Sequence, residues 1–431
     1  MATQTLMEEI ISQIIDTFSG SLRELSLKAR EKPILPTLYS VLTTVQIHQN
    51  PELCYGEHMA HDVICNYLVK YSSLCGITVV RKAYGLETSF LAEYVNGDGE
   101  VVDFCAEYDA LPEIGHGCGH NLIAISSIAS FLGLAAVMER TGIPGKVRLL
   151  GTPAEEGGGG KIKLIEAGAL KYTTASLMSH PTPQFPHMPA GSAGVAFGSC
   201  LAATGLLANF TGKPAHAAQM PWAGVNALDA ATLAYQAVGL LRQHIRPSDR
   251  INIIIPEGGT AHNIIPDKAQ VRVNVRSETL KEMNALRERV ENCMKGAALA
   301  TGCAVDIVPA MDPYADIRPN ESLCTEFTRY MGSKGLDYYC DLQKKDIGAF
   351  STDMGNISYQ VPSFHGHFFI PTPPGTAMHT EAFRDAAKTE EAHDIAMSVG
   401  KGMAVAGLKV LTDKCFAAQM KDYFEKDKKL R

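Results

Sequence analysis

Five side chains with metal-ligand chemistry are spread along this chain of 431 residues, with one spare carboxylate beside them. They offer a thiolate, imidazoles and a carboxylate: Cys118, His120, Glu156, His180 and His379. Glu155 directly precedes Glu156 and is the carboxylate that is not counted among the five ligands. A hydrolytic metal centre needs ligands that hold the ion and also a base that moves a proton. The combination therefore favours a metal-dependent hydrolase over a purely structural metal site.

Cys118 and His120 lie in a glycine-rich loop, Gly-His-Gly-Cys-Gly-His-Asn. Alternating glycines let the backbone take unusual turns, so side chains at positions i and i+2 can converge on one point. The alternative is a flexible turn with an incidental buried cysteine, and the triplet alone does not decide between the two. His116 belongs to the same loop, and we interpret it as structural or supporting rather than as a ligand.

The pair Glu155-Glu156 follows Thr-Pro-Ala and precedes a run of four glycines. Adjacent side chains point in different directions, so Glu156 can bind a metal while Glu155 acts as the general base. Acids at the start of a helix, where they complement the macrodipole, are the alternative interpretation. The glycine run ends in Lys161 but lacks the spacing of a phosphate-binding loop.

Three further residues could contact a substrate. His216 could polarise a carbonyl oxygen, or it could merely cap the helix that follows. Asn263 and Arg276 could hold the oxygens of a substrate carboxylate or amide. For Asn263, a role as a plain turn residue is equally compatible with the sequence.

The elements that must position these residues alternate between strands and helices. We expect strands at 78–80, 90–92, 101–104, 147–150 and 175–178, and helices near 5–28, 37–48, 56–72, 121–139 and 160–167. Such alternation predicts an α/β sheet with helices on both faces.

The candidate residues follow the ends of the expected strands. Asp109 comes after the third strand, the glutamate pair comes after the fourth, and His180 closes the fifth. Ligands of open α/β sheets bind beyond the carboxyl ends of the strands. Motifs that are independent in sequence therefore converge on one edge of the predicted sheet.

The pattern changes between residues 195 and 309. Strand-like segments at 201–210, 251–255, 269–275 and 304–308 alternate with helices near 224–242 and 278–299. This β-α-β-β-α-β order is typical of a ferredoxin-like unit. We therefore predict an inserted lid domain at 195–309 and a catalytic domain made of 1–194 and 310–431, which delivers His379.

Composition excludes several classes of protein. Apolar residues make up 46% and charged residues 20% of the chain, and the formal net charge is −7, so neither a nucleic-acid nor a membrane partner is expected. The eleven cysteines are irregularly spaced and contain no CxxC pair. This usage indicates reduced thiols and predicts a cytoplasmic protein.

Several motifs together resemble the aminoacylase/carboxypeptidase family of two-metal peptidases (the MH clan), in its amidohydrolase branch and closest to its β-alanyl-lysine dipeptidase type. They are Ile47-His48-Gln49-Asn50-Pro51-Glu52-Leu53, Glu107-Tyr108-Asp109-Ala110-Leu111-Pro112, the loop GHGCGHN, GTPAEEGGGGK and GGTAHNIIPD. The resemblance runs almost from end to end. It implies a zinc-peptidase-like α/β/α catalytic domain with an inserted ferredoxin-like α+β lid through which two copies dimerise.

The resemblance also implies roles for single residues. Cys118, His120, Glu156, His180 and His379 match the metal ligands, and Glu155 matches the general base. Asp109 matches an acid that orients ligands, while Glu107 stands where more distant relatives carry a metal-binding histidine. His216 matches a lid histidine that reaches the partner's active site in relatives, and Asn263 matches a substrate-binding asparagine.

These inferences predict an amidohydrolase that cleaves an N-acyl amino acid or a dipeptide with two divalent ions, zinc in preference to manganese. The soft thiolate of Cys118 favours zinc over magnesium or calcium. Two other functions stay open from the sequence. One is a cysteine-dependent amidase that uses Cys118, and the other is a catalytically silent dimeric binding protein of the same fold.

Overall fold

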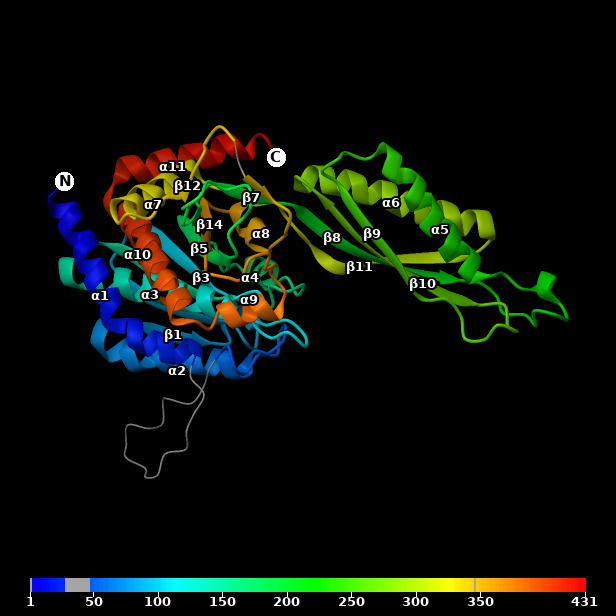
Figure 1. The fold of residues 1–431 in the computed structure, drawn as a ribbon, viewed down its shortest axis with the longest axis horizontal. Helices are drawn as coiled ribbons and strands as arrows, with labels where there is room; N and C mark the ends of the chain where they lie inside the picture. Colours follow the sequence, from blue (N-terminus) through cyan, green and yellow to red (C-terminus); the bar gives the residue numbers. More distant parts are fainter. Residues whose placement is uncertain (1, 28–46, 345) are drawn as a thin grey trace, which may run out of the picture. The chain divides into compact units, whose positions relative to one another are not determined.

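A computed structural model describes residues 2–27, 47–344 and 346–431, which form two compact units. The first unit comprises the described part of Met1–Ser199 together with Ile317–Asp346 and Asn356–Leu430; the second comprises Cys200–Asp316 and Ile347–Gly355. Figure 1 traces the chain through both. The helix expected near 37–48 lies almost wholly outside the described residues.

The first unit is built on one mixed sheet. Its strands are β1 (Thr78–Arg81), β2 (Phe90–Asn96), β3 (Val101–Ala106), β4 (Gly145–Gly151), β5 (Ala175–Thr182), β6 (Gly194–Val195), β12 (Tyr338–Tyr339) and β14 (Ser363–Phe369). They are hydrogen-bonded in the order β1-β2-β4-β3-β5-β14-β6-β12. The four central strands β4, β3, β5 and β14 are parallel. All of the expected strands of this unit are therefore confirmed.

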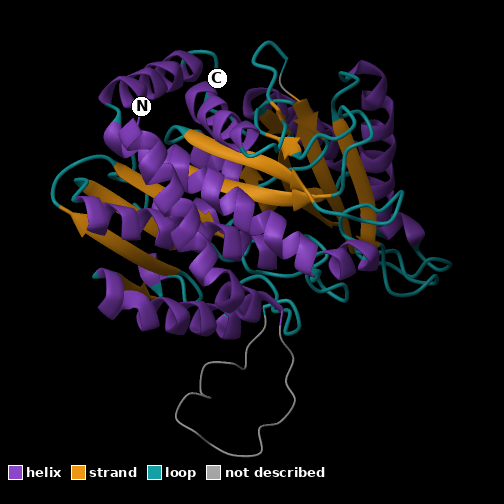
Figure 2. Ribbon diagram, turned by 60° about the vertical axis from the view of Figure 1, so that its left-hand side comes forward, coloured by secondary structure: helices purple, strands orange, loops and turns teal. Residues whose placement is uncertain are grey.

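The helices of the first unit are α1 (Ala2–Leu27), α2 (His58–Cys75), α3 (His120–Thr141), α4 (Gly160–Glu166), α7 (Glu321–Ser333), α9 (Glu381–Ala386), α10 (Glu390–Thr412) and α11 (Lys414–Lys428). Helix α3 packs against α1 and α10 and against strands β3 and β5. Figure 2 shows long helices lying side by side across the strands of this unit.

Helix α3 is apolar on all sides because it lies in the centre of the core. Every residue from His120 to Met138 is buried, and a helix that is hydrophobic all round requires such surroundings. Helices α3 and α10 are both long and apolar enough to cross a membrane. The complete burial of α3 inside the first unit accounts for its hydrophobicity as core packing.

The second unit has the predicted β-α-β-β-α-β order. Its elements are β8 (Ala202–Thr211), α5 (Ala227–Leu241), β9 (Arg250–Glu257), β10 (Lys268–Ser277), α6 (Leu280–Thr301) and β11 (Ala304–Tyr314). The strands form an antiparallel sheet in the order β11-β8-β10-β9. Figure 1 shows α5 and α6 together over one face of this sheet, as expected for a ferredoxin-like unit.

The bounds of the second unit differ from the predicted 195–309. Strand β11 continues beyond residue 309 because Tyr314 still pairs with Ala203 of β8. The segment Ile347–Gly355 also belongs to this unit. Hydrogen bonds hold it there, since Leu201 N donates to Phe350 O at 2.9 Å and the Arg276 guanidinium donates to Ser351 Oγ at 3.1 Å. The chain passes between the units within β7 (Gly198–Cys200), between Asp316 and Ile317, and within β13 (Asp346–Gly348) and α8 (Met354–Ser358).

Candidate metal centre

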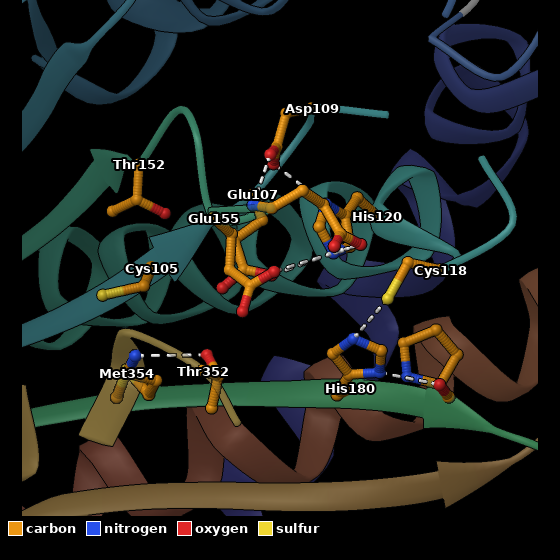
Figure 3. A network of polar contacts seen from close by, with 12 residues as sticks. Cys105, Glu107, Asp109, Cys118, His120, Thr152, Glu155, His180, Thr352 and Met354 are labelled. Atoms are coloured by element: carbon orange, nitrogen blue, oxygen red, sulfur yellow. Dashed lines mark hydrogen bonds and ion pairs between the residues drawn. The ribbon is translucent and has the colours of Figure 1, made fainter. Parts of the chain in front are cut away.

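The predicted ligands come together in the first unit, at the carboxyl edge of the parallel strands. Asp109 follows β3, and Glu155 and Glu156 follow β4. His180 lies inside β5, which continues for two residues to Thr182 instead of ending at the histidine. Figure 3 shows Glu107, Glu155 and His120 facing one another, with Cys118 and His180 beside them. The sheet edge therefore gathers side chains that are far apart in the sequence.

Three groups of ligand atoms lie close enough to hold a cation. Within each group the atoms are all within 4.8 Å of one another: Cys118, His120 and His180; Cys118, Glu156 and His379; and Glu107, His120 and Glu155. All five predicted ligands are included. Cys118 belongs to two groups and so connects them. Such an arrangement can accommodate two neighbouring cation positions.

Both buried histidines present Nε2 to the centre because Nδ1 is already engaged. Nδ1 of His120 lies 2.9 Å from Asp109 Oδ1, and Nδ1 of His180 lies 2.7 Å from the carbonyl oxygen of Pro181. With Nδ1 engaged in this way, Nε2 is the nitrogen of each ring that can bind a metal. Such outer hydrogen bonds fix the tautomer and orientation of metal-binding histidines.

Asp109 orients two of the candidate ligands at once. Its second oxygen, Oδ2, accepts a hydrogen bond from the backbone N–H of Glu156 at 2.9 Å. Burial alone would raise the pKa of Asp109, but the neighbouring His120 and the Glu156 N–H lower it. Asp109 is therefore an anion that anchors His120 and the turn carrying the glutamate pair.

The centre is lined by buried polar atoms that lack hydrogen bonds. Among the described residues, no hydrogen-bond partner is found for Glu107 Oε2, His120 Nε2 and Glu156 Oε1. His120 Nε2 lies 3.5 Å from Glu107 Oε2 and 3.9 Å from Glu156 Oε1. Buried polar atoms normally have partners. Carboxylate oxygens and an imidazole nitrogen that face one another without hydrogen bonds fit a bound cation.

Burial and neighbouring charges shift the pKa values of three of the candidate ligands. Burial raises the pKa of the Cys118 thiol, and the charge of Glu156 raises it further. Burial, together with the nearby His120, lowers the pKa of His180 and keeps this ring neutral. Burial alone would also lower the pKa of His120, but the nearby Cys118 and Asp109 raise it. Metal binding at Cys118 therefore has to displace the thiol proton, as metal–thiolate sites do.

Three residues of the site have a positive φ angle, a backbone conformation that favours glycine. Gly119, the N-cap of α3, has φ = 76°, and a Cβ there would lie 2.6 Å from Pro181 Cγ. Only glycine fits this position. Ala154 and His379 also have positive φ, 60° and 61°. Such strain in residues other than glycine concentrates at functional sites.

Glu57 is a positioning residue that the sequence reasoning missed. Its carboxylate is completely buried. Oε1 accepts a hydrogen bond from the backbone N–H of the strained Ala154 at 2.9 Å, and Oε2 accepts one from the Thr88 hydroxyl at 2.8 Å. Burial and the neighbouring Asp109 raise the pKa of Glu57 to about 7. Glu57 thus holds the turn that directly precedes Glu155.

We expect Glu57→Ala to lower kcat at least tenfold, because the freed Ala154 N–H loses its acceptor and the glutamate pair shifts. Glu57→Gln is the matched control: its amide oxygen still accepts from Ala154, and its NH₂ can donate to the Thr88 hydroxyl. Steady-state kinetics on both variants, with thermal melting to verify folding, check this expectation. Equal loss of kcat in the two variants would contradict it.

Other buried groups around the centre also escaped the sequence reasoning. Lys161, which ends the glycine run, forms a fully buried ion pair with Glu107 at 2.5 Å. His365 and His367 of β14 lie next to His180, each with a ring-centroid separation of 6.3 Å. Histidines at alternate positions of an apolar strand were the signal that could have found them. His116 is buried and lies outside the three groups, in agreement with a supporting role.

The remaining predicted residues belong to the second unit. The His216 and Asn263 loops are paired, with Ala217 N donating to Asn263 O at 3.0 Å. Nδ1 of His216 accepts hydrogen bonds from the backbone N–H groups of Ala218 and Gln219 at 3.2 and 3.1 Å. Nδ1 of His216 therefore caps a turn rather than a helix, which leaves Nε2 as the ring nitrogen that can donate. Arg276 lies in β10, where it donates to Asn274 Oδ1 at 3.0 Å.

Comparisons with known proteins agree with this architecture. Residues 201–301 match a family model described as a peptidase dimerisation domain. The chain is 38% identical to a mouse Xaa-Arg dipeptidase, over 84% of this chain and 83% of that protein. It is 35% identical to the human Xaa-Arg dipeptidase, over 89% of this chain and 87% of that protein. It is also 30% identical to one of the polypeptides of the Escherichia coli p-aminobenzoyl-glutamate hydrolase, over 61% of this chain and 55% of that polypeptide.

Among solved structures, the fold is similar to a Bacillus subtilis protein described as a dinuclear metal binding peptidase from the M20 family. The TM-score is 0.62 at 20% identity, and the match covers 92% of this chain and 99% of that one. An aminobenzoyl-glutamate utilization protein from Klebsiella pneumoniae matches with a TM-score of 0.64 at 18% identity, over 94% and 99%. At these identities the likeness concerns the fold.

Proposed function

The chain belongs to the M20 peptidase family, and from this premise we propose that it is a metal-dependent amidohydrolase that cleaves a dipeptide or an N-acyl amino acid. The observation that carries the proposal is the arrangement around Cys118. Two groups of ligand atoms share this thiol, and Glu155 stands beside them within a third. The relatives are named for the hydrolysis of a peptide or amide bond. A silent binding protein has no need for a base placed in this way.

We propose two divalent ions as cofactors, with zinc preferred to manganese. Cys118, His120 and His180 would hold one ion, and Cys118, Glu156 and His379 the other. The thiolate and the imidazoles suit zinc better than manganese, which prefers oxygen ligands. When bound, such ions polarise the scissile carbonyl and lower the pKa of a water molecule.

Glu155 is the general base in this proposal. It is buried, and its Oε2 lies 3.9 Å from His120 Nε2, so it faces the centre. It takes the proton of the attacking water and then returns it to the nitrogen of the leaving amine. Asp109 and Glu57 hold the backbone on either side of it, which keeps the carboxylate in place during both transfers.

The second unit would supply groups that bind the substrate. We propose that Nε2–H of His216 donates to the oxyanion, since Nδ1 is occupied by backbone N–H groups. Arg276 would hold the carboxylate of the amine-side residue, with Asn263 as a further contact. Arg276 lines a pocket of about 500 Å³ together with Arg250 and Asn252, which suits an anion.

We also propose that two copies associate through the second unit. The match of residues 201–301 to a peptidase dimerisation domain supports this assembly. A cytoplasmic location remains a prediction from cysteine usage.

A cysteine-dependent amidase is the alternative that one contact favours. Cys118 Sγ lies 3.4 Å from His180 Nε2, the distance of a thiol–imidazole pair. However, an activated nucleophilic cysteine needs a lowered pKa, whereas burial raises the pKa of this thiol. His180 also donates from Nδ1 to a carbonyl oxygen rather than to a carboxylate. The metal-dependent reaction therefore has the better support.

Chelation separates these functions. We expect purified protein to hydrolyse members of a panel of dipeptides and N-acyl amino acids, to lose activity after chelation, and to regain it when zinc or manganese is added back. Turnover that survives complete metal removal but is abolished by thiol alkylation would indicate the cysteine-dependent amidase. Metal binding without turnover of any amide would indicate a silent binding protein.

A further inference from the structure

Two loops of the first unit enclose a groove beside the metal centre. They are the segments 183–190 and 372–378, and the groove has a volume of about 840 Å³. Pockets for small ligands have volumes of this order. The first loop follows β5, which carries His180, and the second loop leads directly into His379. Each wall of the groove is thus covalently continuous with a candidate metal ligand.

Side-chain contacts also connect the groove to the centre. The ring of Phe185, in the wall of the groove, lies 6.0 Å from the ring of His367. The His367 ring in turn lies 6.3 Å from that of His180. The backbone N–H of His379 donates to Gly117 O at 2.9 Å, which ties the end of the second loop to the GHGCGHN turn. These contacts place the groove next to the candidate ligands His180 and His379.

The chemistry of the groove is apolar and uncharged. Among the residues described, its lining includes Phe185, Met188 and Met378 together with several prolines, and it contains no Asp, Glu, Lys or Arg. Gln184 and two threonines are its polar side chains. One of them, Thr376, already donates its hydroxyl to Pro373 O at 2.7 Å. A cationic group placed here would lose water without gaining a counter-ion.

We propose that this groove is the specificity pocket for the acyl side of the substrate and that it accepts an uncharged, apolar acyl chain or side chain. The inference rests on the proposed amide hydrolysis and adds to it the class of acyl group that the substrate carries. The acyl group is bonded to the carbonyl carbon that the metal centre must hold, so it lies next to the ligands. The carboxylate of the amine side is assigned to Arg276 in the second unit and does not compete for this groove.

Two amides that differ in one terminal group test the proposal. N-heptanoyl and N-(6-aminohexanoyl) derivatives have the same length and differ by a methyl in place of an ammonium group. The amine-side amino acid is kept constant, chosen as the one with the highest turnover. We expect kcat/KM to be at least about tenfold higher for the heptanoyl compound, the scale on which apolar pockets discriminate between substrates.

Gln184→Glu places a carboxylate in the groove at an exposed position with almost no change in shape. We expect this variant to lower the ratio of the two kcat/KM values about two- to fivefold, since the ammonium group gains a counter-ion at an exposed position. Gln360→Glu is the matched control, because Gln360 is also exposed in the first unit and does not line the groove. The control should keep the wild-type ratio.

The outcomes distinguish this inference from the proposed function. Chelator-sensitive turnover with equal kcat/KM for the two amides, or with the same ratio in Gln184→Glu as in wild type, overturns the acyl pocket alone. An effect of equal size in Gln360→Glu also overturns it, because the change would then be a general effect of charge. Chelator-sensitive turnover of other amides, with none for either of these two compounds, also overturns the acyl pocket alone. Absence of chelator-sensitive turnover for every amide of the panel overturns the proposed function and, with it, the inference.

Discussion

Glu155→Gln is expected to lower kcat about 10³-fold, within the range that general acid–base catalysis contributes, while the metal content stays unchanged. Glutamine has nearly the same shape as glutamate but cannot take a proton from water. Glu155 is the carboxylate of the pair that lies outside the two Cys118 groups, so its loss leaves their ligand atoms in place. Steady-state kinetics together with elemental analysis of the same preparation measure both quantities.

Glu156→Gln is the matched control for this prediction, because it makes the same chemical change one residue away. Glu156 shares a group with Cys118 and His379, and its Oε1 lies 3.5 Å from His379 Nε2. We expect this variant to bind less metal as well as to lose activity. Near-normal turnover by Glu155→Gln would show that another group acts as the base. Metal loss in Glu155→Gln would reassign it as a ligand.

Cys118→Ala is expected to remove metal from both positions and to abolish activity. The thiol is the member that the groups with His120 and with Glu156 share. Loss of an outer partner of a ligand already weakens metal affinity about 10–100-fold, so loss of a shared ligand should exceed about 100-fold. Titration with zinc against a competing chelator measures the affinity, and elemental analysis gives the stoichiometry.

Cys105→Ala is the control for Cys118→Ala. Cys105 is also buried, but it lies within β3 and its Sγ contacts Ser176 Oγ at 3.4 Å. It belongs to none of the three groups of ligand atoms. We expect this variant to keep its metal, with a modest loss of stability from the smaller side chain. If Cys118→Ala binds zinc as tightly as Cys105→Ala, the thiol is not a ligand.

The candidate centre could be predicted in part because its residues sit in unusual local sequences. Cys118 and His120 lie between glycines, and Gly119 has the positive φ that this loop requires. The glutamate pair follows a buried strand, and the order of strands and helices places that strand's end at a sheet edge. Local rules of this kind need no knowledge of distant contacts.

Other members of the site depend on contacts that no local pattern encodes. Glu57 directly precedes α2, and its sequence position is that of an ordinary acid near a helix start. However, its carboxylate accepts a hydrogen bond from the backbone N–H of Ala154, 97 residues away. Lys161 follows a glycine run and turns inward to Glu107. His367 lies beside His180 only because β14 pairs with β5 across nearly two hundred residues.

By itself, the sequence determined the kind of chemistry and the α/β class with its β-α-β-β-α-β insertion, and it pointed to the six side chains that we propose as five ligands and a base. Only the tertiary structure decided that Cys118 belongs to two groups of ligand atoms, which nitrogen each histidine presents, and which loops enclose the apolar groove. The physical reason is that residue types and spacing report local preferences. Sheet order and strand register are set by the packing of the whole core, and they determine which distant side chains meet.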